Sequence, residues 1–197
     1  KPGEPSFESP WGKGRPGWHI ECSAMSMSLL GETLDIHAGG ADLVFPHHEC
    51  ELAQSEKATG KLFAKYWMHN GFININKEKM SKSLGNIISL NNLINEYGGN
   101  VIRYLYLQTH YRSPINFTDS LLKQSKNSLE RIHDFVRNLE MPKDDGALSD
   151  QVKQYIDNSR TKFVSGMDDD FETPEALAAL YELIKDVNIY QDDTNLT

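Results

Sequence analysis

The five residues Lys79–Ser83 read Lys-Met-Ser-Lys-Ser, so two lysines stand three residues apart in a short polar segment. Two ammonium groups at this spacing neutralise the β- and γ-phosphates of a nucleotide as charge builds on a leaving pyrophosphate, while serine hydroxyls and backbone N–H groups donate hydrogen bonds. By chance this pentapeptide is expected in only about one chain in ten thousand of this length. We therefore interpret Lys79 and Lys82 as candidate catalytic residues acting on a polyphosphate, rather than as part of an ordinary exposed loop.

A second set of residue types suits a metal ion. His47 and Glu51 are four residues apart, and on a helix that spacing places both side chains on one face. Cys22, on an earlier expected helix, can supply a thiolate. A histidine and a glutamate at this spacing more often form a solvated pair, so the spacing alone leaves both interpretations open. Cys50 lies about 60° from the midpoint of the face carrying His47 and Glu51, which favours a packed thiol there.

A glycine-rich turn offers a third candidate site. Gly39, Gly40 and Asp42 follow a short β-like run at 33–37. Glycines permit close approach of a ligand to the backbone, and a carboxylate accepts a hydrogen bond from a hydroxyl group. Gly40 and Asp42 are therefore candidates for contact with the ribose of ATP, while a simple tight turn remains the alternative.

The elements that position these groups alternate between helices and strands. Gly31 and Gly60 follow two helical patterns and are expected to end them. Such alternation predicts an α/β layer with a mostly parallel sheet, in which ligands bind beyond the carboxyl ends of the strands. The sequence predicts helices at 20–30 and 45–59, strands at 33–37 and 66–75, and a turn at 76–78.

From Ser89 onward the pattern becomes helical throughout. A stretch at 141–147 contains proline and glycine and is the expected boundary between two groups of helices. The helices are predicted at 89–97, 101–109, 119–139, 149–164 and 173–190.

Composition excludes several classes of protein. The 197 residues are 39% hydrophobic and carry a net charge of −8, which fits a folded domain and argues against nucleic-acid binding over the whole surface. Acidic residues are concentrated after Gly166, whereas lysines and arginines recur from Lys57 to Arg137. No apolar run approaches the roughly 18 residues of a membrane span, and two cysteines are too few for a disulfide scaffold. We expect a cytoplasmic protein without membrane contact.

Several segments together resemble one family. The Lys-Met-Ser-Lys-Ser motif is a signature of class I aminoacyl-tRNA synthetases, and other segments resemble cysteinyl-tRNA synthetases in particular. They read GRPGWHIECSAM at 14–25, DIHAGGADL at 35–43, FPHHECELAQS at 45–55 and MDDDFETPEA at 167–176.

The resemblance implies an α/β fold, the C-terminal half of a Rossmann-like class I synthetase catalytic domain, followed by an all-α helical region. Three regions are expected. Residues 1–88 would hold the zinc site and the lysine motif, 89–142 a helical stem-contact region, and 143–197 the start of a C-terminal helical domain.

The resemblance also implies one zinc ion per full-length subunit. The family holds zinc in the amino-acid pocket with two cysteines, a histidine and a glutamate, and Cys22, His47 and Glu51 match three of these positions. Trp18 and His37 match positions that line the cysteine pocket. The fourth ligand and a His-Ile-Gly-His-type ATP motif are expected in an earlier part of the domain, so the fragment is expected to be inactive alone.

The implied reaction has two steps. The carboxylate of cysteine attacks the α-phosphate of Mg-ATP to give cysteinyl-adenylate and pyrophosphate. The 3′ end of cysteine tRNA then accepts the cysteinyl group. Lys79 and Lys82 would assist pyrophosphate departure, with Lys82 contacting ATP. The expected partners are cysteine, ATP and cysteine tRNA, and the expected state is a monomer. Two alternatives stay open, the cysteine ligase of mycothiol synthesis and a zinc-stabilised RNA-binding module without catalysis.

Overall fold

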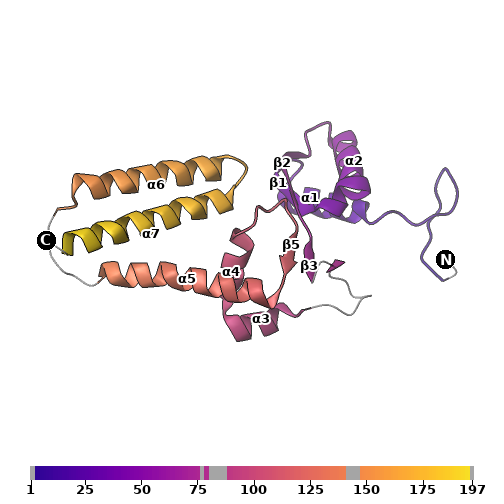
Figure 1. Ribbon diagram of the computed structural model, residues 1–197. Helices are drawn as coiled ribbons and strands as arrows, with labels where there is room; N and C mark the ends of the chain where they lie inside the picture. Colours follow the sequence, from indigo (N-terminus) through magenta and orange to yellow (C-terminus); the bar gives the residue numbers. More distant parts are fainter. Residues whose placement is uncertain (1–2, 76–77, 80–87, 141–146, 196–197) are drawn as a thin grey trace. The chain divides into compact units, whose positions relative to one another are not determined.

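The computed structural model describes residues 3–75, 78–79, 88–140 and 147–195. These residues form two compact units that meet in the sequence between Gly71 and Phe72 (Figure 1). The predicted domain ranges 1–88, 89–142 and 143–197 stay predictions. Among the residues that the structure describes, no helix combines the length and the apolar character needed to span a bilayer.

The first unit is a parallel β-α-β arrangement preceded by a helix. Its two strands pair in parallel with Leu34 opposite Ala64 and Gly40 opposite Asn70, as predicted for an α/β layer. Leu34, Phe63 and Ala64 form its buried core, against which Leu52 and Trp67 pack. The elements are α1 (His19–Leu30), β1 (Leu34–Gly40), the 3₁₀ turn η1 (Ala41–Leu43), the π turn η2 (Val44–His48), α2 (Glu49–Thr59) and β2 (Ala64–Asn70).

The predicted single helix over 45–59 is wrong at its start. Phe45 has φ −135° and ψ 133°, which is extended backbone, because a residue before proline is disfavoured in the α region. Phe45 lies within η2, and α2 begins only at Glu49. The helix ends as predicted at Gly60, whose φ of 68° places it in the left-handed region with its N–H bonded to the Glu56 carbonyl.

The second unit combines a small sheet with five helices among its described residues. The strand order is β4-β3-β5, with β3 and β5 parallel and β3 and β4 antiparallel. The predicted strand at 66–75 is therefore divided at Gly71 between two sheets, and β5 was not predicted. The elements are β3 (Ile73–Ile75), β4 (Glu78–Lys79), α3 (Leu90–Tyr97), α4 (Gly99–Leu107), β5 (Ile115–Phe117), α5 (Asp119–Glu140), α6 (Asp150–Asp168) and α7 (Thr173–Asn195).

Two apolar clusters stabilise the second unit. Ile102, Leu105, Phe117 and Leu122 join α4, α5 and β5. Phe135 of α5 packs with Ile184 and Val187 of α7, and α6 lies beside α7 as a helical hairpin (Figure 1). The helices confirm the predicted helical character after Ser89 except at strand β5, and the amphipathic helices bury apolar faces against one another.

Candidate metal centre

Three side chains of the first unit bring metal-ligand atoms together. Cys22 comes from α1, His47 from η2 and Glu51 from the first turn of α2, and their ligand atoms all lie within 4.8 Å of one another. Their helices pack together, and buried Ser23 donates a hydrogen bond to Gln54 Oε1 at 3.1 Å. One face of α1 is thereby held against α2, which places the Cys22 thiol beside His47 and Glu51.

Glu51 lies at the middle of this cluster. Its side chain is fully buried, with Oε2 2.5 Å from His37 Nε2 and Oε1 3.0 Å from His47 Nε2. Within the described part of the chain, His47 Nδ1 and Glu51 Oε1 are buried without a well-formed hydrogen bond. Burying a carboxylate is costly unless it is paired or coordinates a metal, so a fully buried Glu51 among donor atoms of Cys22, His37 and His47 fits a centre that binds a cation.

The chemistry of the donor set also fits zinc. A thiolate, an imidazole nitrogen and a carboxylate oxygen are all zinc ligands. Burial, together with the neighbouring Glu51 carboxylate, raises the pKa of the Cys22 thiol. A bound divalent cation reverses this effect and deprotonates a coordinating thiol. Cys50 belongs to neither of the donor groups found among the described residues.

Aromatic rings surround the metal ligands. The ring of Trp18 lies 4.3 Å from the ring of His47 and is 59% exposed, so it stands at the outer side of the centre. His37 lies 4.9 Å from Trp67 with the rings edge to face. The structure therefore brings both predicted pocket residues, Trp18 and His37, next to the predicted metal ligands, although their contact with a substrate stays a prediction.

Sequence reasoning missed a pair of histidines beside this pocket. His48 is buried, and its Nδ1 lies 2.8 Å from His69 Nε2. Burial and the nearby His37 imidazole lower the pKa of His48 to about 4. His37, His48 and Glu51 form a second group of ligand atoms within 4.8 Å. His69 could not be found by spacing, because it reaches this place through the parallel register that sets it opposite Gly39.

The glycine turn lies at the carboxyl end of β1. A Cβ at Gly39 would meet the His48 ring at 2.7 Å, and a Cβ at Gly40 would meet Asp42 Oδ1 at 2.6 Å. Close packing against the buried His48 ring thus explains Gly39 without a ligand, whereas the contact at Gly40 is with an exposed side chain that can move away. Asp42 is exposed in η1, where the predicted contact of Gly40 and Asp42 with ATP remains a prediction.

The lysine motif belongs to the second unit. Lys79 lies in β4 opposite Asn74, so the motif begins at the end of a paired strand. The side chain of Lys79 and the whole of Lys82 lie outside what the structure describes. Their catalytic roles stay predictions.

Comparisons with known proteins agree with the resemblance in the sequence. The model of the tRNA synthetase class I (C) catalytic domain matches residues 1–127, and the DALR domain model matches residues 162–197. A cysteine–tRNA ligase of Carboxydothermus hydrogenoformans is 54% identical over 100% of this chain and 43% of its own length. That of Thermodesulfovibrio yellowstonii is 52% identical over 98% of this chain and 41% of its own length.

Two solved structures share the fold. A LeuRS chain in a complex with tRNA and LeuAMS from Agrobacterium radiobacter aligns with a TM-score of 0.70 at 16% identity, over 95% of this chain and 29% of that chain. Methionyl-tRNA synthetase of Mycobacterium tuberculosis with methionyl-adenylate aligns with a TM-score of 0.62 at 20% identity, over 82% and 34%. The chain thus spans less than half the length of the relatives it matches.

Proposed function

The chain belongs to the family of class I (C) tRNA synthetases, and we propose that the full-length protein is a cysteine–tRNA ligase. It would activate cysteine with ATP and transfer it to the 3′ end of cysteine tRNA. The observation that carries this proposal is the convergence of Cys22, His47 and Glu51 on one buried point. A thiolate, imidazole and carboxylate set suits a zinc ion that recognises a thiol substrate.

Cys22, His47 and Glu51 would hold the zinc ion, and Glu51 would also orient His37 through the 2.5 Å contact. When bound, zinc supplies a position for the thiolate of cysteine, which it prefers to the harder hydroxyl of serine. A purely apolar pocket separates such similar side chains only modestly. Selection of cysteine would therefore occur at binding, with Trp18 and His37 shaping the space around its side chain.

The proposed nucleotide-binding residues are Gly40, Asp42, Lys79 and Lys82. Gly40 and Asp42 would contact the ribose, since a carboxylate at the carboxyl end of a parallel strand is well suited to accept hydroxyl hydrogens. Lys79 and Lys82 would stabilise the charge that develops on pyrophosphate when Mg-ATP is attacked at its α-phosphate. In this scheme the protein positions the reactants and neutralises charge without a covalent intermediate on a side chain.

Helix α5 offers a surface for tRNA. The basic residues considered for tRNA contact are Lys123, Lys126, Arg131 and Arg137. Two of them already have partners, because Arg131 lies over the Tyr181 ring at 5.1 Å and Arg137 pairs with Asp134. Lys123 and Lys126 are exposed and stand three residues apart, which places them on one face. We propose that these two lysines contact tRNA phosphates, and that the enzyme acts as a cytoplasmic monomer.

The test is ATP–pyrophosphate exchange by the full-length protein. Exchange should depend on cysteine and should be far weaker with serine or without an amino acid. Exchange that is absent, or equally strong with serine, would contradict the proposal. A non-catalytic RNA-binding module would give no exchange.

The acceptor separates the ligase from its nearest alternative. The relatives named cysteine–tRNA ligase support tRNA over the amino sugar of mycothiol synthesis. Full-length protein supplied with radiolabelled cysteine and ATP should therefore label cysteine tRNA. Transfer to the amino sugar and not to tRNA would show the other ligase activity.

A further inference from the structure

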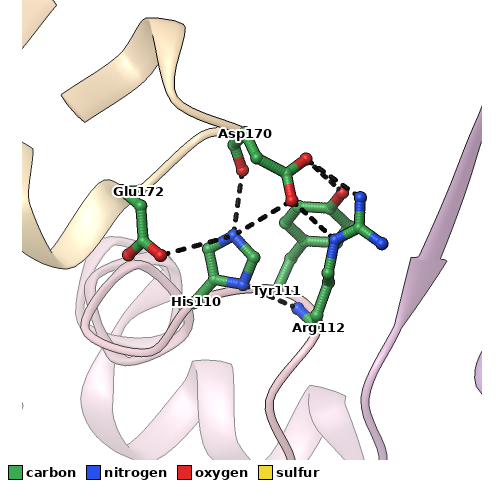
Figure 2. Close-up of polar contacts among 5 residues, drawn as sticks. All are labelled: His110, Tyr111, Arg112, Asp170 and Glu172. Atoms are coloured by element: carbon green, nitrogen blue, oxygen red, sulfur yellow. Dashed lines mark hydrogen bonds and ion pairs between the residues drawn. The ribbon is translucent and has the colours of Figure 1, made fainter. Parts of the chain in front are cut away.

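The turn between α6 and α7 is held by three consecutive residues from a distant part of the chain (Figure 2). Arg112 donates to Asp170 from Nε to Oδ2 at 2.6 Å and from Nη2 to Oδ1 at 3.2 Å. Tyr111 donates its hydroxyl to Oδ1 at 2.7 Å, and His110 Nε2 lies 2.9 Å from the Asp170 backbone oxygen. We call this group, His110, Tyr111, Arg112 and Asp170, the turn clamp.

The turn clamp acts on backbone that L-residues rarely adopt. Asp170 and Phe171 have φ angles of 52° and 58°, both in the left-handed region. The turn is also tightly packed, because a Cβ at Gly166 would lie 3.3 Å from the Glu172 carbonyl oxygen. Strained backbone persists where the surroundings determine it. Tyr111 and Arg112 bind the Asp170 carboxylate, and His110 contacts the Asp170 backbone carbonyl. These contacts indicate that the left-handed backbone of the turn is specifically maintained.

The turn clamp is connected to the lysine motif through hydrogen-bonded elements of one unit. The Ser113 N–H bonds to the His110 carbonyl at 2.9 Å, and β5 begins two residues later at Ile115. Ile115 pairs with Ile73 of β3, and β3 pairs with β4, where Asn74 lies opposite Lys79. Asp170 thus holds the segment that leads into β5. Strand β5 pairs with β3, and β3 pairs with β4, in which the lysine motif begins.

The turn clamp also joins the two family matches. His110, Tyr111 and Arg112 lie within the catalytic-domain match at 1–127, whereas Asp170 lies within the DALR match at 162–197. The turn clamp therefore links a segment of the catalytic-domain match to a residue of the DALR match.

We propose that Asp170 is a positioning residue for adenylate formation, holding His110–Arg112 so that β5, β3 and β4 keep the backbone of Lys79 in its paired position. This inference rests on the proposed function. Asp170 acts through other residues and touches no reactant. Its loss should slow chemistry at the phosphates and leave cysteine binding unchanged, because the cysteine site lies in the first unit.

A second contact keeps the hairpin docked without the turn clamp. Tyr181 of α7 donates to the Ser128 carbonyl at 2.7 Å, and its hydroxyl lies 2.7 Å from the Tyr104 hydroxyl. Together with the apolar cluster between α5 and α7, these bonds hold the helices in place. Removing the Asp170 charge should therefore release the turn clamp without unfolding the hairpin.

The experiment measures the burst of cysteinyl-adenylate formed by the full-length protein, in which amplitude reports the fraction of active enzyme and rate reports the chemical step. Asp170→Asn should lower the burst rate about tenfold or more, since small misplacement of reacting groups is costly. Its burst amplitude, zinc content and KM for cysteine should match the wild type. Tyr111→Phe, which removes one contact, should give a smaller loss of rate.

Glu182→Gln is the matched control, because it removes the Lys162–Glu182 ion pair from the same hairpin and leaves the turn clamp intact. It should not change the burst rate. In a double-mutant cycle, Arg112→Gln with Asp170→Asn should be no slower than the slower single variant. An unchanged rate in Asp170→Asn, or a loss confined to amplitude, would overturn the positioning role. A wild-type protein with no burst would overturn the proposed function, and this inference with it.

Discussion

At the scale of single residues, Glu51 organises the candidate metal centre. One fully buried carboxylate faces His47 through one oxygen and His37 through the other. This arrangement connects a predicted metal ligand with a predicted pocket residue through a single side chain. The position of Glu51 therefore couples metal binding to the shape of the proposed cysteine pocket.

Replacing Cys22 by serine should lower zinc content and cysteine activation together, because a serine hydroxyl is a poor substitute for a thiolate ligand. The measurements are metal analysis and ATP–pyrophosphate exchange on the purified full-length protein. Cys50→Ser is the matched control and should retain about one zinc per protein. Full zinc occupancy in the Cys22→Ser variant would remove this residue from the ligand set.

Replacing Lys82 by alanine should slow adenylate formation about a hundredfold or more, the scale of losing a preorganised charge contact in the transition state. Cysteine binding, measured by equilibrium dialysis, should change far less. Lys77→Ala removes a lysine close to the motif and outside it, and should have little effect. Near-normal exchange by Lys82→Ala would exclude this side chain from the mechanism.

At the scale of elements, α2 carries Glu51 and depends on how it ends. Gly60 has a positive φ, and a Cβ there would meet nothing within 4 Å. Gly60→Ala should therefore destabilise the protein by about 1 kcal/mol through backbone strain alone. Gly99 has equally open surroundings and no positive φ, so Gly99→Ala should be neutral or slightly stabilising.

Thermal unfolding of the two full-length variants checks this prediction. Gly60→Ala should unfold at a lower temperature than Gly99→Ala. Equal midpoints would contradict the strain argument, because the two substitutions add the same methyl group to open space.

The sequence predicts elements well where the signal is local. Glycines at 31 and 60 mark helix ends that depend only on nearby backbone, and the predicted and observed ends agree. The predicted helix start at Phe45 is wrong, because the proline at 46 disfavours the α region for the residue before it and α2 begins only at Glu49. Strand β5 has three residues, too few for a periodic signal.

The candidate site was only partly predictable. Cys22, His47 and Glu51 could be proposed from residue chemistry and a family resemblance, and the structure brings them together. The contact of Glu51 with His37 and that of His48 with His69 depend on the packing of α2 on β1 and on strand register. Those relations are tertiary, and no spacing in the sequence encodes them.

At the scale of the whole molecule, the net charge of −8 means that any contact with tRNA must be local. Replacing both Lys123 and Lys126 by glutamine should weaken tRNA binding and reduce its dependence on salt, because fewer counterions are released. Cysteine-dependent pyrophosphate exchange should be unchanged. The measurement is the affinity for cysteine tRNA at several salt concentrations.

Lys153→Gln is a suitable control, since this lysine pairs with Asp150 at the start of α6. Its affinity for tRNA should equal that of the wild type. A salt dependence that is unaltered in the α5 double variant would exclude this face of α5 from the tRNA surface.

The central claim is that zinc held by Cys22, His47 and Glu51 recognises the thiol of cysteine. The most direct test is X-ray absorption at the zinc edge of the full-length protein, with and without cysteine. The account predicts one additional sulfur neighbour at about 2.3 Å when cysteine is added, and no change with serine. The same number of sulfur neighbours with and without cysteine would contradict it.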